Sequence, residues 1–345
     1  FYMLFSVLKV PNHKTNIKPQ KYKLQVQSIK DEQDIINYNH ILTKFKKNSP
    51  FYSVEYCNFS IFKNLCYFIF YKYNEPYILM PFYLEEINYD LHNKETKYFD
   101  AISPYGFNGP LLNQLVSDAD LKLFWNEVDL WYQSNNVVTE FIRFNLNNNY
   151  LNYSGVLMPT LKNIKGKLIE FDDLWCNVKP KVRNNYRKAT KSGLKSKVFI
   201  DDIDYQAISD LYAIYISSMV RNEASLHYYF SFDYFKYLIK NNSKSILLFL
   251  IYLGDKPISG ELIIIDDKTM YSFLGGTIEE YFQYRPNDFL KIEAIKWGLK
   301  NNKKYFCLGG GRQNDDSLYQ YKKSFFPNDE EAMYYTGRKI INSDI

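Results

Sequence analysis

One order of predicted elements occurs twice along the chain, and this repeat constrains the fold more than any other feature. Each half contains a β-rich run, a short turn and a second β-rich run, at residues 65–84 and 246–265. The first turn reads Asn-Glu-Pro and the second Gly-Asp-Lys-Pro. Apolar runs that are bounded by turn residues in this way predict one β-hairpin in each half.

The elements after each hairpin also correspond. A further strand, a helix with apolar residues at three- to four-residue spacing and a last strand follow both hairpins, at residues 97–144 and 269–308. This order combines antiparallel pairing with one βαβ crossover. It predicts an α/β fold (α+β, with mixed sheets) that is built from two similar units in tandem.

A basic segment, 174–197, lies between the two units, and we expect it to be largely helical. Residues 205–219 and 232–239 also have helical spacing. The Asn-rich stretch 145–164 interrupts the patterning. We therefore predict an N-terminal domain at residues 1–155 and a C-terminal domain at 156–345.

The composition is that of an ordinary globular protein. The 345 residues are 46% hydrophobic and 23% charged, and the length suits two domains. No apolar run reaches the 18 or so residues that span a bilayer, and the opening run 1–8 is far shorter. We expect a cytoplasmic protein, with the inner face of the membrane as an alternative location.

Several enzyme classes lose support from absent motifs. The four cysteines form no C-x-x-C pair, and the four histidines have no metal-ligand spacing. We expect reduced, mostly buried thiols and no metal site. The nucleophile elbow, the P-loop and the G-x-G-x-x-G fingerprint do not occur either.

The strongest local charge asymmetry lies at residues 177–200, which carry eight Lys or Arg and no acid. Arg183 and Arg187 are four residues apart, so they share one face of the helix that Gly193 is expected to end. Two guanidiniums on one face can hold a phosphate or carboxylate. The alternative interpretation is a solvated cationic helix.

A second segment with chemical potential follows the last predicted strand. Gly309-Gly310-Gly311 removes side chains where the backbone must turn sharply or approach a ligand. Asp315-Asp316 is a candidate helix N-cap, and Lys322 lies on the helix that follows. Its ammonium could stabilise negative charge on a carbonyl oxygen. An ordinary helical lysine is the alternative.

Two further segments are candidates for ligand contact. Pro286 is well placed to begin the helix around Trp297, and a helix start can bind phosphate through free backbone N–H groups. A simple helix start is the alternative. The loop 103–110, S-P-Y-G-F-N-G-P, follows a strand and is dense in turn residues, so it could line a cleft or merely close a domain.

Three of these segments resemble the Fem-like branch of the GNAT-fold transferases, which includes peptidoglycan-bridge aminoacyl transferases and predicted N-acyltransferases of glycan loci. R-N-N-Y-R-K-A-T-K-S-G resembles the family's R-x-N-I-R-K-A-x-x-x-G. The stretch 309–326 resembles its G-G followed by L-x-x-F-K-x-x-F, and the loop 103–110 resembles its P-Y-G-Y-x-G-P. The resemblance covers most of residues 50–340 and implies two GNAT-like domains in tandem. Unlike the staphylococcal-type bridge enzymes of the family, this sequence has no long heptad-patterned coiled-coil arm inserted in its second half.

The resemblance also implies roles for particular residues. Arg183 and Arg187 would face the phosphates of an activated glycan precursor, and Tyr105 would contact the substrate. Lys322 would stabilise the oxyanion of acyl transfer, with Tyr321 beside it. The helix that begins at Pro286 and Asn287 matches the one on the cofactor side of the GNAT sheet, although no GNAT pyrophosphate loop is recognisable before it.

Three functions follow from these observations. The first is an acyltransferase that moves an acyl or acetyl group from acyl-CoA to an amine of a sugar or cell-envelope glycan precursor. The second is a Fem-type aminoacyltransferase that takes its donor from aminoacyl-tRNA and acts on a peptidoglycan precursor. The third is a basic, aromatic-rich nucleic-acid or glycan-binding protein without catalytic activity, which leaves the glycine loop and Lys322 without a role.

Overall fold

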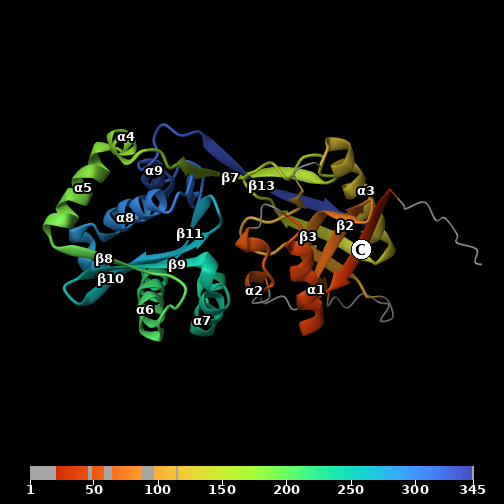
Figure 1. The fold of residues 1–345 in the computed structure, drawn as a ribbon, viewed down its shortest axis with the longest axis horizontal. Helices are drawn as coiled ribbons and strands as arrows, with labels where there is room; N and C mark the ends of the chain where they lie inside the picture. The colour runs from red at the N-terminus through yellow and green to blue at the C-terminus, as the bar shows by residue number, and fades with distance from the viewer. Residues whose placement is uncertain (1–20, 46–48, 58–63, 88–96, 114–115, 344–345) are drawn as a thin grey trace, which may run out of the picture.

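The computed structural model describes residues 21–45, 49–57, 64–87, 97–113 and 116–343. Within them, thirteen strands form one mixed sheet that runs the length of the molecule (Figure 1). The strand order is β1-β2-β3-β4-β6-β13-β7-β12-β11-β10-β9-β8, and the short β5 pairs with β3 off this path. The opening run 1–8 lies outside the described residues.

Each half of the chain supplies the same succession of elements. The first comprises β1 (Tyr22–Ser28), α1 (Glu32–Leu42), α2 (Val54–Cys57), β2 (Leu65–Lys72), β3 (Glu75–Glu86), β4 (Phe99–Ile102), β5 (Leu111–Leu112), α3 (Asp118–Ser134) and β6 (Val137–Arg143). The second comprises β8 (Leu194–Phe199), α6 (Tyr205–Arg221), α7 (Phe232–Asn241), β9 (Ile246–Leu253), β10 (Lys256–Ile265), β11 (Thr269–Thr277), α8 (Pro286–Lys300) and β12 (Tyr305–Gly309). Apart from the short β5, the order along the chain and the order within the sheet agree between the halves, which confirms the tandem mixed α/β fold.

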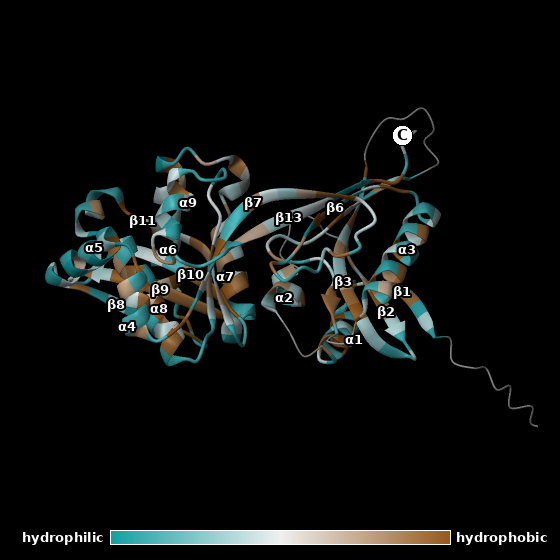
Figure 2. Ribbon diagram, turned by 90° about the horizontal axis from the view of Figure 1, so that it is seen from above, coloured by the Kyte–Doolittle hydropathy of each residue, from teal (hydrophilic) through white to brown (hydrophobic). Residues whose placement is uncertain are grey.

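Two long strands connect the units. β7 (Val156–Lys167) pairs with β12 of the second unit along one edge and with β13 (Glu331–Ile340) along the other. β13 then pairs with β6 of the first unit, so the last strand of the chain lies in the middle of the sheet (Figures 1 and 2). The division into domains 1–155 and 156–345 stays a prediction.

Helices cover both faces of the second unit. The short α4 (Phe171–Asn177), α5 (Pro180–Lys191) and α8 lie on one face, and α6 and α7 lie on the other (Figure 1). Buried apolar side chains of the helices and the sheet form a cluster on each face. Figure 2 shows the hydrophobic residues of this unit in brown on the ribbon. One of these clusters also joins the two units, since the Phe51 ring of the first lies 5.1 Å from the Tyr271 ring of the second.

Local sequence signals predicted most of the helices and strands, and the structure corrects one of these predictions. The segment 174–197 is not helical throughout. Gly193, at a φ of +79°, ends α5, and strand β8 begins at Leu194. Three of the four cysteines are buried and all are free thiols. Among the described helices, none is both long and apolar enough to cross a membrane.

Candidate functional site

The second unit contains a fork between two parallel strands. β11 and β12 pair only at Thr269–Tyr271 with Tyr305–Cys307. Beyond that point β11 continues along β10 to Thr277, whereas β12 continues along β7. The two strands therefore diverge, and the backbone leaves a wedge between their carboxyl ends. In α/β sheets such a divergence of neighbouring strands is a preferred position for a ligand.

The glycine loop lies at the end of β12, beside this fork. Gly309 adopts a φ of +75°, a conformation that glycine accepts without strain. A Cβ on Gly311 would lie 2.0 Å from Asp316 Oδ1. Asp316 is the N-cap of α9 (Ser317–Lys323) and accepts hydrogen bonds from the Tyr319, Arg312 and Gln313 amides, which confirms the N-cap predicted at residues 315–316.

Lys322, on α9, reaches back to the glycine loop. Its Nζ donates a hydrogen bond to the Gly310 carbonyl at 2.6 Å. Burial, together with the nearby charge of Lys291, lowers the pKa of Lys322 to about 8. The lysine is therefore a cation held in a poorly solvated position next to the fork, where hydrogen bonds to a charged group are stronger than in water.

A buried ion pair lies next to Lys322. Lys291 of α8 contacts both carboxylate oxygens of Glu261 on β10, at 2.5 and 2.6 Å, and donates to Ser272 Oγ at 2.9 Å. Both charged side chains are about 93% buried. Glu261 is thus fully engaged, which argues against its use as a free proton acceptor.

Asp315 and Asp316, which follow the glycine loop, also have interaction partners. Asp315 forms an ion pair with Lys162 at 2.9 Å, and Asp316 caps α9. Asp315 and Asp316 therefore have structural roles that compete with proton transfer.

A pocket of about 220 Å³ opens at the start of α8. Three residues singled out from the sequence line it: Pro286 and Asn287, the first two of α8, and Tyr321 of α9. Thr277, Phe282, Arg285 and Asp288 complete the lining. The Tyr321 hydroxyl is buried and has no hydrogen-bond partner among the described residues. The Tyr321 ring packs on Phe325 at 5.3 Å. Burial raises the pKa of the Tyr321 hydroxyl, so it keeps its proton at neutral pH.

The start of α8 lacks a side-chain cap. Arg285 stands at the N-cap position with a φ of +60°, and its side chain makes no capping hydrogen bond. A left-handed conformation at a residue other than glycine costs about 1–2 kcal/mol. Backbone strain of this kind tends to occur at functional positions. Pro286 at the first helical position confirms the helix start expected from the sequence.

Arg183 and Arg187 lie elsewhere on α5. Arg183 Nη1 donates to the Trp175 and Cys176 carbonyls at 3.2 and 3.0 Å, at the end of α4. The Arg187 guanidinium lies 5.7 Å from the Trp175 ring and is exposed. Lys181 and Asn185, which are also on α5, both act to lower the pKa of Asp288, one of the residues that line the pocket. The structure therefore does not bring the two arginines into the pocket that contains Tyr321.

Tyr105 approaches the second unit from the first. Its loop docks on β11, where Phe107 lies 5.5 Å from Tyr271 and the Tyr105 ring lies 6.3 Å from Phe273. The Arg143 guanidinium lies 5.8 Å from the half-exposed Tyr105 ring. Phe273 lies two residues beyond Tyr271, the last residue of β11 that pairs with β12, so the Tyr105 ring stands beside the part of β11 that diverges from β12.

The sequence analysis missed Asp288, the third residue of α8. Its side chain is buried, with 7% of the residue exposed, and within the part of the chain that the structure describes its Oδ1 has no hydrogen-bond partner. Burial raises the pKa of this carboxyl, although Asn185 and Arg285 act in the opposite direction. The sequence contained one clue: both helices that follow a hairpin and strand begin with an Asp near the same place, at Asp120 and Asp288.

Comparison with known proteins agrees with this geometry. Residues 180–323 match the family model of the acetyltransferase (GNAT) domain. No curated protein matches the sequence significantly. Among solved structures, FemX is similar with a TM-score of 0.63 at 10% identity, over 92% of this chain and 96% of FemX.

Two other solved structures have the same arrangement. A tandem GNAT protein from the clavulanic acid biosynthesis pathway matches with a TM-score of 0.52 at 8% identity, over 93% of this chain and 99% of that protein. The C-terminal domain of a putative lysylphosphatidylglycerol synthetase from Agrobacterium fabrum matches with a TM-score of 0.52 at 10% identity, over 77% and 82%. Residues 180–323 are therefore similar to the GNAT acetyltransferase domain, and the fold of the chain is similar to that of tandem GNAT proteins.

Proposed function

We propose that this protein is an N-acyltransferase that moves an acyl group from acyl-CoA to an amine of a sugar or cell-envelope glycan precursor. The observation that carries the proposal is Lys322, a cation of lowered pKa between the glycine loop and the strand fork. GNAT domains typically use acyl-CoA as a co-substrate, and the match over residues 180–323 contains both the fork and Lys322.

The donor and acceptor approach the fork from different sides in this proposal. The uncapped start of α8 offers the Asn287 and Asp288 amides, and Arg285 adds a positive charge at the pocket, which suits the phosphates of the donor. The acceptor amine comes from the side of Tyr105. Arg183 and Arg187 remain candidates for the acceptor's phosphates at a distance from this pocket.

The chemistry is aminolysis of a thioester. The amine nitrogen forms a bond to the acyl carbon, and the carbonyl oxygen becomes an oxyanion that the Lys322 ammonium stabilises. Collapse of this intermediate breaks the carbon–sulfur bond. The proton that the amine nitrogen loses passes through solvent to the departing thiolate, which leaves as the free thiol. The raised pKa of Tyr321 keeps its hydroxyl protonated, so it acts at most as a neutral hydrogen-bond donor in this step.

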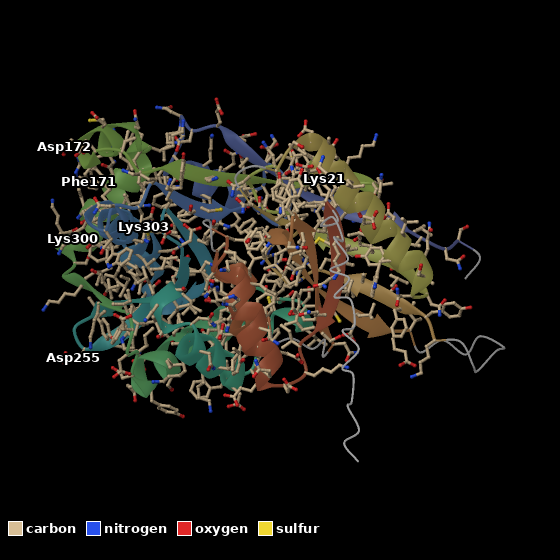
Figure 3. All side chains as sticks on the ribbon, turned by 45° about the vertical axis from the view of Figure 1, so that its right-hand side comes forward. Lys21, Phe171, Asp172, Asp255, Lys300 and Lys303 are labelled. Carbon is tan, nitrogen blue, oxygen red and sulfur yellow. The ribbon has the colours of Figure 1, made fainter. Side chains whose placement is uncertain are left out.

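Substitution of Lys322 tests this proposal directly. Lys322→Met should reduce turnover, followed as thiol release from acetyl-CoA with a panel of amino sugars, by about 100-fold or more. The melting temperature should stay within a few degrees of the parent value. Lys300→Met is the matched control, because Lys300 projects from the far end of α8 into solvent (Figure 3). Turnover that survives in Lys322→Met would remove this lysine from the reaction.

The second candidate donor is aminoacyl-tRNA. The exposed cations of α5 and β8 favour it, because no Lys or Arg of residues 177–200 takes part in an ion pair within the described part of the chain. Phosphate contacts of these residues would make tRNA binding fall steeply as salt rises. A thermal-shift titration with tRNA and with CoA, each at low and moderate salt, separates the two donors.

A further inference from the structure

Two lysine ammonium groups lie close to the fork between β11 and β12. Lys291 Nζ donates to Ser272 Oγ at 2.9 Å, and Ser272 is the first residue of β11 beyond its pairing with β12. The same ammonium lies 5.6 Å from the Phe306 ring of β12. Further along β12, a Cβ on Gly309 would lie 3.5 Å from Lys322 Nζ. The two ammonium groups thus lie near neighbouring parts of β12, next to the fork.

The Glu261 carboxylate is committed to Lys291. Both of its oxygens accept from Lys291 Nζ, at 2.5 and 2.6 Å, and Oε1 also accepts from Ser272 Oγ. Lys322 forms none of the ion pairs among the described residues, and its hydrogen bond goes to the Gly310 carbonyl, which is uncharged. One ammonium at the fork is therefore neutralised, and the other is left without a counter-ion.

The first unit carries apolar residues at the corresponding places of the repeat. Lys291 is the sixth residue of α8 and Glu261 the sixth residue of β10. The sixth residues of α3 and β3 are Leu123 and Met80. Replacement of a buried ion pair by apolar residues of similar size often leaves stability unchanged. The fold can therefore be built with apolar side chains at these places, and the charged pair of the second unit calls for another reason.

We propose that Lys291 is a positioning residue for Lys322: it binds the Glu261 carboxylate so completely that the Lys322 ammonium keeps no counter-ion and stays available to the oxyanion of acyl transfer. The inference rests on the proposed function and adds to it a residue that does not touch the substrate. Without Lys291, the Glu261 carboxylate would attract the Lys322 ammonium. An ion pair of Lys322 with Glu261 would then compete with the oxyanion for the same positive charge.

The titration of Lys322 agrees with this arrangement. Burial is the largest cause of its lowered pKa of about 8, the charge of Lys291 lowers the pKa as well, and the charge of Glu261 raises it. The titratable groups that act on Lys322 come from four elements: Lys291 of α8, Glu261 of β10, Cys307 of β12 and Asp316 at the start of α9. The β7 side chain beside Gly309, Asn163, is uncharged. Removal of the Lys291 charge should therefore raise the pKa of Lys322, and removal of the Glu261 charge should lower it.

The pKa of Lys322 in the intact protein is the first measurement. NMR of isotope-labelled lysine side chains follows it with pH, and the signal is assigned by its absence in Lys322→Arg. Lys291→Met should raise the pKa by about one pH unit or more, and Glu261→Gln should lower it by about as much. The double variant Lys291→Met/Glu261→Gln should return the pKa close to the parent value. Opposite shifts that cancel identify an effect of charge, because a loss of packing would not change sign.

Turnover is the second measurement. Thiol release at neutral pH should fall about tenfold or more in Lys291→Met and should recover to within about threefold of the parent rate in the double variant. Lys296→Met is the matched control, because Lys296 lies on the same helix in a partly exposed ion pair with Glu293 at 2.9 Å. It should change neither the pKa of Lys322 nor the rate.

Each result has a defined meaning. If Lys291→Met does not fold, Glu261→Gln and the double variant decide the question, since the first must still lower the pKa and the second must restore it. A pKa that stays constant, or that moves in the same direction in both single variants, overturns the inference. A restored pKa without restored turnover overturns it as well. If the pKa shifts as expected but the parent protein releases no thiol, the proposed reaction has failed, whereas Lys291 still sets the charge of Lys322.

Discussion

The crossovers of the two units, β4–α3–β6 and β11–α8–β12, have the same topology but differ in how completely they are closed. In the first unit the chain beyond β4 stays bound to β6: the Ser103 amide donates to the Phe141 carbonyl at 2.9 Å, and the Asn108 amide donates to the Arg143 carbonyl at 3.2 Å. In the second unit β11 and β12 separate after three paired residues.

The starts of the two crossover helices, α3 and α8, also differ in how completely they are capped. α3 begins with a capping box between Ser117 and Asp120, whereas α8 begins at a strained Arg285 without any side-chain cap. The comparison teaches that one copy of the repeat has used its polar groups for stability. In the other copy, Asp288 Oδ1 and the Tyr321 hydroxyl have no hydrogen-bond partner among the described residues, and the Lys322 ammonium forms no ion pair there. This is expected where a fold trades stability for a site.

The largest expected effect on stability concerns the closed copy. Asp120→Asn should lower the free energy of unfolding by about 3 kcal/mol, because it removes the negative charge that Lys72 pairs with and replaces one acceptor oxygen by an NH2 group that faces hydrogen-bond donors. Urea unfolding measures the loss. Asp118→Asn, an exposed change in the same helical turn, is the control and should cost far less. Equal losses in the two variants would contradict the comparison.

The second prediction concerns two lysines, one in each unit, whose pKa values are shifted in opposite directions. The hydrogen bond to Asp120 raises the pKa of Lys72, whereas burial lowers the pKa of Lys322 to about 8. If protonated Lys322 stabilises the oxyanion, turnover should fall about tenfold per pH unit above pH 8. Lys322→Arg keeps its charge over this range, so any activity that it retains should lack this decline. A profile that stays flat to pH 10 in the unmodified protein would contradict the assignment.

The smallest effect concerns the open copy and has the opposite sign to the first. Asp288→Asn should raise the free energy of unfolding by about 1 kcal/mol at neutral pH, because it removes a buried carboxylate that has an unpartnered oxygen. The folded-state pKa of Asp288 is raised, so the folded protein holds this proton to higher pH than the unfolded chain does. Its cost therefore grows as pH rises through the raised pKa and vanishes below about pH 4, where both states are protonated.

Denaturant unfolding at several pH values measures this gain. Asp255→Asn is the control, since Asp255 is exposed at the turn between β9 and β10 and its loss should give no gain at any pH. A loss of stability in Asp288→Asn at neutral pH would mean that the carboxylate is satisfied after all.

Much of the fold was predictable because its signals are local. The hairpins at 65–84 and 246–265 follow from apolar runs around turn residues, and they appear as β2–β3 and β9–β10. Gly193 ends α5, Pro286 begins α8 and Asp316 caps α9, as their side-chain chemistry requires. β7 and β13 were missed, because each is stabilised by partners far away in the sequence.

The candidate site divides in the same way. The amino-acid sequence by itself determined the repeated order of elements, the helix that carries Lys322 and the glycine loop before it, since each depends on residues within a few turns of chain. Only the tertiary structure decided which groups are left without partners. Asp120 and Asp288 look alike in the sequence, and they differ because Lys72 and Tyr22 reach one of them across the sheet, whereas Leu253 and Leu194 stand at the corresponding places beside the other. Burial and long-range pairing set the pKa and the hydrogen bonding of such a group, and neither can be read from its neighbours along the chain.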